Sequence, residues 1–181
     1  MAPQRHDLIV VGASAGGVEA LRSLVATLPP DLRAAVAVVL HLPVGGVSAL
    51  PHILRRSGKL PTVSAGNGMP VRPGTIYAAP PDHHTLVIED QFVLSHGPTE
   101  NGHRPAINAL FRSAAVSMGP RVIGVQLAKL TTENHIGSAP ALSSLLELEN
   151  DIANNQRSDV DYQANGLGVS SGFSCLTARA Y

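Results

Sequence analysis

The segment G-A-S-A-G-G at residues 12–17 places one serine among glycines and alanines, directly after an apolar run. Ser14 satisfies the G-x-S-x-G pattern, in which a serine on a sharp strand-to-helix turn is exposed as a nucleophile. The segment lacks the lysine of a P-loop and does not fit the glycine pattern of dinucleotide-binding proteins. Backbone N–H groups at the start of a helix can also bind an anion. Three interpretations therefore stay open: a nucleophilic serine, an anion-binding loop and a plain tight turn.

A nucleophilic serine needs a base within hydrogen-bond reach, normally a histidine. His41 directly follows the apolar run at 34–40, so we expect its ring at the carboxyl edge of a sheet, where Ser14 also lies. Consecutive strands are commonly neighbours, which would bring the two side chains together as nucleophile and general base. The competing interpretation is a histidine that ends a strand and bonds to the backbone. The other histidines lie in turns or polar segments, and we expect His83 and His84 to be exposed.

Strand-like and helical patterns alternate along the first 127 residues, and these elements must position the two side chains. Continuous apolar runs predict strands buried on both faces at 7–12, 34–40 and 121–127. Apolar residues at helical spacing predict helices over 17–28, 49–56 and 105–118. Shorter strands are predicted at 74–81, 84–90 and 91–97, the last two forming a hairpin. The alternation predicts an α/β fold with a doubly wound, mostly parallel sheet and an antiparallel hairpin insertion.

The composition narrows the possible classes of protein. The chain has 181 residues, of which 44% are hydrophobic, and its 13 basic and 13 acidic residues balance. A balanced charge argues against electrostatic binding of nucleic acid or of a membrane surface. No apolar run approaches the roughly 20 residues that span a bilayer. A single cysteine, Cys175, excludes an internal disulfide and a closed cysteine zinc site. We expect a cytoplasmic protein without cofactor or metal.

The character of the sequence changes after residue 128. Residues 138–181 contain five acidic and two basic residues, whereas the preceding part is positive. The stretch 141–153 has the pattern of a short amphipathic helix, and the remainder is rich in small polar residues and is expected to be loop or disorder. We therefore divide the chain into a domain at 1–137 and a segment at 138–181 that consists of a helix and a flexible tail.

Five stretches of the sequence, in order, resemble the catalytic domain of the CheB-type chemotaxis protein-glutamate methylesterases. They are VVGASAGGVEALRSLVATLP, VVLHLP, GNGMPVRPGTIYAAPPDHHTLV, NGHRPAINALFRSAA and GPRVIGVQL, within residues 6–128. The resemblance implies a serine hydrolase that removes methyl esters from glutamyl side chains of chemoreceptors, releases methanol and can deamidate glutamines. Because the resemblance begins within the first ten residues, the receiver domain found in many members is not expected in this chain.

The resemblance also implies roles for individual residues. Ser14 would be the nucleophile and His41 the base, with Ala15 and Gly16 around the oxyanion site. Arg104 would lie beside the pocket. The partners implied are methyl-accepting chemoreceptors and a receptor methyltransferase.

Several positions depart from the family pattern. The aspartate that completes the family's triad is replaced, and Glu133 falls at the corresponding place. Glutamate can orient a histidine, although it is one methylene longer. Asn108 stands where the pattern has aspartate, and Ala106 replaces a serine. The family's closing helix and last strands have no counterpart in the sequence. We therefore expect impaired catalysis and missing C-terminal strands.

Two further functions remain as alternatives to hydrolysis. A non-catalytic module derived from a methylesterase would keep the surface that binds the receptor or the transferase, without turnover. A nucleotide- or phosphate-binding domain would use the loop at 12–17, but the sequence lacks the lysine and the acidic ribose partner that such a site needs.

Overall fold

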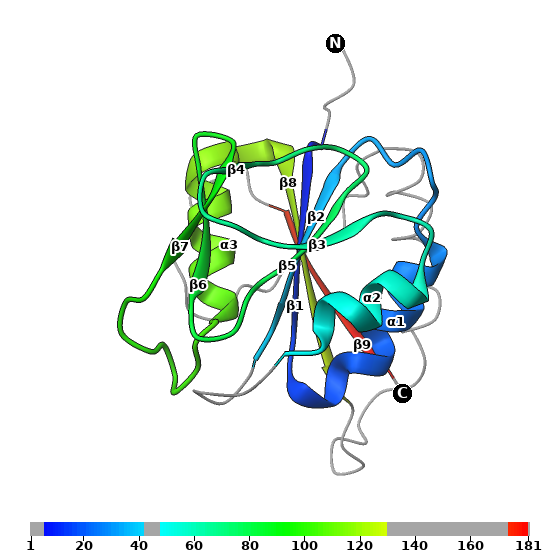
Figure 1. The fold of residues 1–181 in the computed structure, drawn as a ribbon, viewed down its shortest axis with the longest axis horizontal. Helices are drawn as coiled ribbons and strands as arrows, with labels where there is room; N and C mark the ends of the chain where they lie inside the picture. The colour runs from blue at the N-terminus through cyan, green and yellow to red at the C-terminus, as the bar shows by residue number, and fades with distance from the viewer. Residues whose placement is uncertain (1–5, 42–47, 130–173, 181) are drawn as a thin grey trace.

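The computed structural model describes residues 6–41, 48–129 and 174–180. A six-stranded sheet with the order β3-β5-β2-β1-β8-β9 forms its centre, and all neighbouring strands are parallel (Figure 1). The strands are β1 (Leu8–Ala13), β2 (Ala35–Leu40), β3 (Thr62–Ser64), β5 (Ile76–Ala78), β8 (Val122–Lys129) and β9 (Ser174–Ala180). Strand β1 lies between β2 and β8, so the strand order reverses at its carboxyl end, which is where ligands bind in open α/β sheets.

The two faces of the sheet are covered by different elements (Figure 1). Helices α1 (Val18–Thr27) and α2 (Leu50–Ser57) cover one face, and α3 (Ile107–Met118) covers the other. Successive residues of a strand point to opposite faces. Ile9 and Val11 accordingly belong to the core beneath α1 and α2, whereas Leu8 and Val10 belong to the core beneath α3. Every residue of β1 and β2 is buried, which accounts for their continuous apolar sequences.

A small antiparallel sheet packs beside α3 on the second face. It has the order β4-β7-β6 and consists of β4 (Met69–Pro70), β6 (His84–Ile88) and β7 (Gln91–Ser95). Glu89 and Asp90 form the turn between β6 and β7, both with positive φ angles. Two short 3-10 helices, η1 (Ala15–Gly17) and η2 (Gly119–Arg121), complete the described elements. None of the helices described is long and apolar enough to cross a membrane.

The expected alternation of strands and helices is confirmed, including the hairpin of β6 and β7. Helix α3 begins two residues later than predicted, because Ala106 has an extended backbone with φ −110° and ψ 138°. The expectation of loop or disorder at the end of the chain is wrong for Ser174–Ala180, which pairs in parallel with β8 as strand β9. The sheet therefore extends beyond β8, although we expected the C-terminal strands to be missing. The expected helix at 141–153 and the division at residue 137 lie outside the described residues.

Candidate active site

Ser14 and His41 follow the ends of two neighbouring strands. Strands β1 and β2 pair in parallel with Ala13 opposite Leu40, and the His41 N–H donates a hydrogen bond of 2.9 Å to the Ala13 carbonyl. The next residues of the two strands are thus side by side at the carboxyl edge of the sheet. The topology thus places Ser14 and His41 at adjacent strand ends, as the sequence led us to expect.

The serine is exposed, and a tight turn follows it. Ser14 has an extended backbone, with φ −77° and ψ 168°, and its carbonyl accepts the Gly17 N–H at 2.8 Å as η1 begins. The N–H groups of Ala15 and Gly16 lie in the first turn of η1, where backbone donors have no acceptor within the helix. Two backbone donors thus directly follow Ser14 in the chain, as the donors of an oxyanion hole can follow a nucleophilic serine.

His41 is held by contacts from the loop that leads into α3. The Ile107 N–H donates to its Nε2 atom at 3.1 Å. The ring of His103 stacks on the ring of His41, with a centroid separation of 4.2 Å and an angle of 14° between the planes. Burial, and secondly the nearby His103, lower the pKa of His41 below its usual 6.5. Both effects favour the neutral imidazole that a general base needs. No hydrogen bond joins Ser14 to His41 among the described residues.

The start of α3 can approach the sheet closely because residue 12 is a glycine. A Cβ atom at position 12 would lie 2.4 Å from Cγ2 of Ile107, which is well inside van der Waals contact. A tight turn was one interpretation of the segment 12–17, and in the structure Gly12 makes room for the helix that contacts His41. The preceding N–H of this segment, that of Ala106, donates to Nδ1 of His84 at 3.2 Å.

The expectation that His84 is exposed is wrong. His84 is only 4% exposed, and its Nε2 atom lies 2.8 Å from the Pro98 carbonyl oxygen. Because Nδ1 accepts an N–H, the ring proton of neutral His84 is on Nε2 and is donated to Pro98. His84 therefore holds the loop before α3 from two sides. His83, at the adjacent position, is half-buried.

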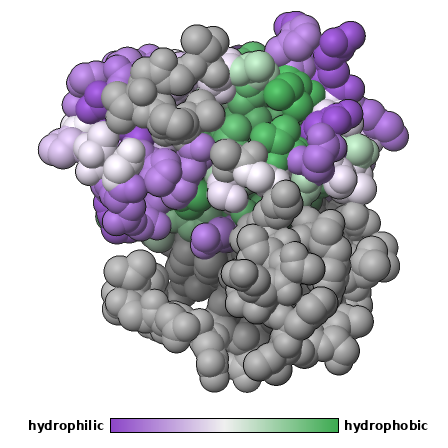
Figure 2. Space-filling model, turned by 90° about the horizontal axis from the view of Figure 1, so that it is seen from below, coloured by the Kyte–Doolittle hydropathy of each residue, from purple (hydrophilic) through white to green (hydrophobic). Residues whose placement is uncertain are grey.

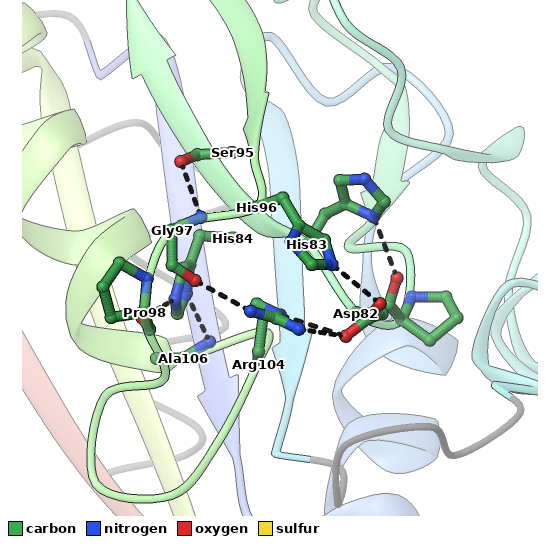
Figure 3. Close-up of polar contacts among 10 residues, drawn as sticks. Asp82, His83, His84, Ser95, His96, Gly97, Pro98, Arg104 and Ala106 are labelled. Carbon is green, nitrogen blue, oxygen red and sulfur yellow. Dashed lines mark hydrogen bonds and ion pairs between the residues drawn. The ribbon is translucent and has the colours of Figure 1, made fainter.

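Arg104 contacts protein groups from the loop between β7 and α3 (Figure 3). Its Nε and Nη2 atoms donate to Oδ1 of Asp82 at 3.0 and 2.7 Å, and its Nη1 atom donates to the Gly97 carbonyl at 2.9 Å. Nε2 of His96 lies 3.0 Å from the other carboxylate oxygen of Asp82. The hydrogen bonds from Arg104 and then His96 lower the pKa of Asp82. Arg104 was expected beside the pocket; its guanidinium anchors the loop that carries His103.

The face at the carboxyl ends of the strands carries both hydrophobic and hydrophilic residues. Figure 2 views the molecule from below Figure 1, and hydrophobic residues gather there between two hydrophilic areas in the coloured part of the surface.

The sequence matches the family described as CheB methylesterase over residues 9–135. The chain belongs to the CheB methylesterase family. It is 36% identical over 141 residues to protein-glutamate methylesterase/protein-glutamine glutaminase 2 of Methanosarcina mazei, covering 74% of this chain and 38% of that protein. It is 40% identical over 126 residues to the corresponding protein 1 of Cupriavidus metallidurans, covering 67% of this chain and 35% of that protein.

A solved structure has the same fold as this member of the CheB methylesterase family. The crystal structure of the Thermotoga maritima CheB methylesterase catalytic domain aligns with a TM-score of 0.63 and 24% identity, over 81% of this chain and 77% of that one. This likeness confirms the predicted α/β architecture. The chain spans less than half the length of the curated relatives that it matches.

Some site residues expected from the CheB resemblance can be placed and others cannot. Ser14, His41, Gly16 and the backbone of Ala15 lie at one edge of the sheet, whereas Glu133 lies outside the described residues. Sequence reasoning missed His103 and Ile107, although both lie within the stretch NGHRPAINALFRSAA that carries part of the resemblance. The described residues contain no group of three histidine, cysteine or acidic side chains arranged to hold a metal.

Proposed function

We propose that this chain is a protein-glutamate methylesterase that acts on chemoreceptors and can also deamidate their glutamines. The pairing of β1 with β2 carries the proposal, because it sets Ser14 and His41 at adjacent strand ends. The N–H groups of Ala15 and Gly16 at the start of η1 support the second element that acyl transfer needs, an oxyanion hole. The curated relatives are named for both reactions.

In the proposed acylation, the Ser14 hydroxyl attacks the carbonyl carbon of a glutamyl methyl ester. His41 Nε2 takes the hydroxyl proton, and the negative charge of the tetrahedral intermediate is stabilised by the N–H groups of Ala15 and Gly16. When the intermediate collapses, the bond to the methoxy group breaks, and His41 returns its proton to release methanol. The product is a glutamyl ester of Ser14.

In the proposed deacylation, His41 removes a proton from water, which attacks the same carbonyl carbon. Collapse of the second intermediate breaks the bond to Ser14 and restores the serine hydroxyl with the proton from His41. The receptor is released with a free glutamate. With a glutamine substrate, ammonia leaves in place of methanol and the second half of the reaction is the same.

We further propose Glu133 as the residue that orients His41. A neutral ring that accepts the Ile107 N–H at Nε2 carries its proton on Nδ1, and a triad acid accepts a hydrogen bond from this N–H while the proton stays on the ring. Since the longer glutamate replaces the aspartate of the family pattern, we expect a reduced turnover. Glu133→Asp would then raise the rate, whereas Glu133→Gln would lower it further, by up to about 10⁴-fold.

The proposed partners are methyl-accepting chemoreceptors, which supply the substrate side chains, and a receptor methyltransferase that installs the esters. The expected place of action is the cytoplasm. The second candidate function is receptor binding without turnover. It is favoured by one observation, that the Ile107 N–H occupies Nε2 of His41 while Ser14 makes no bond to that ring.

The test is methanol release from a methylated chemoreceptor in membrane vesicles. Ser14→Ala should lower turnover by at least about 10³-fold. Ser64→Ala is the matched control, because Ser64 is also exposed and lies on edge strand β3, and it should leave the rate unchanged. A fluorophosphonate probe should label the wild type at Ser14 and leave the Ser14→Ala variant unlabelled. Wild type that binds the receptor but releases no methanol would establish the binding module instead.

A further inference from the structure

His103 lies in a small turn that fixes its position. Its N–H and carbonyl bond to the carbonyl and N–H of Glu100 at 3.0 and 3.1 Å. Asn101 and Gly102 between them both have positive φ angles, 50° and 76°, which asparagine and glycine tolerate in tight two-residue turns. The backbone of His103 is therefore fixed by its own turn, independently of the ring stack on His41.

The residues after His103 are anchored as well. Figure 3 shows Arg104 pointing between Asp82 and Gly97, with bonds to both, and Ala106 bound to His84. The Arg104 side chain is only 13% exposed and that of Asp82 is 40% exposed, so the pair is shielded from water on the arginine side. The chain is therefore held both before and after His103, whose ring stacks on that of His41.

The fold alone does not account for a histidine at position 103. Its Nδ1 atom is buried and has no hydrogen-bond partner among the described residues, which costs about 1–3 kcal/mol for a buried polar group. A hydrocarbon ring would stack in the same place without this cost. The stability of the loop therefore does not explain this ring, and its stack on His41 points to a role in the site.

We propose that His103 is a positioning residue for the base. Its ring, stacked flat on His41, restricts the His41 imidazole to one plane as Nε2 moves from the Ile107 N–H to the Ser14 hydroxyl. The catalytic role of His103 rests on the proposed hydrolase function. The stacking of its ring on His41 is independent of that function. Burial and the charge of a protonated His103 both work against protonation of His41, so the same contact keeps the base neutral.

The test compares His103→Phe, which keeps a flat ring, with His103→Ala, which removes it. We expect kcat for methanol release to fall about 10–100-fold in His103→Ala with KM nearly unchanged, since small misplacements of a catalytic group have such effects. His103→Phe should restore kcat to within a few-fold of the wild type. Equal loss in both variants, or no loss in His103→Ala, would overturn the proposal.

Histidine NMR titration of the full chain provides a readout that does not depend on activity. In His103→Ala the pKa of His41 should rise toward 6.5, because part of its burial and the neighbouring charge are both removed. His52→Ala is the control, since His52 is exposed on α2 and its ring bonds to Arg55 of the same helix. If the wild type releases no methanol, the proposed function fails, but an unchanged His41 titration in His103→Ala would still refute the positioning role. If His103→Ala does not fold, His103→Asn, which also lacks a ring, takes its place in the comparison with His103→Phe and the wild type.

Discussion

His41 and Ile107, 66 positions apart in the sequence, are joined by a hydrogen bond from the Ile107 N–H to Nε2 of His41 at 3.1 Å. Because Nε2 accepts this bond, it is the unprotonated nitrogen of the ring, and neutral His41 carries its proton on Nδ1. A base that activates a serine through Nε2 needs the same tautomer. The first N–H of α3 thus selects the usable form of the base, and this bond must break when Nε2 takes up a proton.

Gly12→Ala should disturb the hydrogen bond between Ile107 and His41, because the added methyl group collides with the Ile107 side chain. The added Cβ would lie 2.4 Å from Cγ2 and 3.0 Å from Cδ1 of Ile107, so the start of α3 must move away from the sheet. We expect a loss of about 1–3 kcal/mol in the free energy of unfolding, as for other overpacked cores, together with a lower kcat. Urea unfolding and methanol release measure the two effects.

Two variants control for the general effect of a glycine substitution. Gly66→Ala places its Cβ at an ordinary 3.4 Å from the flexible end of Met69 and should change neither quantity. Combining Gly12→Ala with Ile107→Ala removes the clash, so the double variant should lose less stability than the sum of the single variants. Strict additivity would mean that the contact with Ile107 is not the cause.

The lowered pKa of His41 predicts how activity depends on pH. The base works only when neutral, so kcat/KM should fall on the acid side with a midpoint below 6.5, the usual pKa of histidine. A midpoint above 6.5 would contradict the burial of the ring as the dominant influence. The measurement is the rate of methanol release between pH 5 and 8, over which the receptor substrate must stay intact.

The same shift makes a prediction for stability. Unfolded His41 titrates near 6.5 and folded His41 at a lower pH, so in this interval the unfolded chain binds more protons. The contribution of His41 is complete above 6.5 and is lost as the pH falls from 6.5 through the lower folded pKa. The difference in unfolding free energy between wild type and His41→Gln should follow this course. A difference that grew toward acid pH would have the wrong sign.

The parts of the fold that could be predicted are those with a strong local pattern. Strands β1, β2 and β8 have continuous apolar runs because they lie inside the sheet. Helices α1 and α3 have apolar residues at helical spacing because one face of each packs on the sheet. Strand β9 was missed because it forms by pairing with the edge of β8, and nothing in its own small residues requires a strand. The burial of His84 was missed because its partner, Ala106, lies 22 residues away, beyond the reach of a local pattern.

Ser113→Ala should destabilise the packing of α3 on the small sheet. The Ser113 hydroxyl accepts the Val87 N–H at 3.0 Å, and Val87 is only 1% exposed. The variant leaves this N–H without a partner, which should cost about 1–3 kcal/mol of unfolding free energy. Ser57→Ala is the control, since the Ser57 hydroxyl only donates to the Ile53 carbonyl within α2. Equal losses in urea unfolding for the two variants would refute the role of the Val87 bond.

Asp82→Asn tests whether the Asp82–Arg104 pair holds the loop that carries His103. Asp82 has a φ of 58°, which asparagine tolerates, so the variant removes the charge with little strain. Arg104, which is largely buried, then keeps its charge without a carboxylate, and an uncompensated buried charge is unfavourable. Hydrogen exchange should become faster at the backbone N–H groups of 97–106, and kcat should fall as the ring of His103 loosens.

Asp90→Asn is a closely matched control for this variant. Asp90 also has a positive φ, 57°, and also pairs with an arginine, Arg121, but that side chain is 41% exposed. Exposed ion pairs contribute little because water and salt screen them. Exchange at 97–106 should therefore be unchanged in Asp90→Asn. If the two variants altered the loop equally, the burial of Arg104 would not be what makes the Asp82 pair hold His103 over the base.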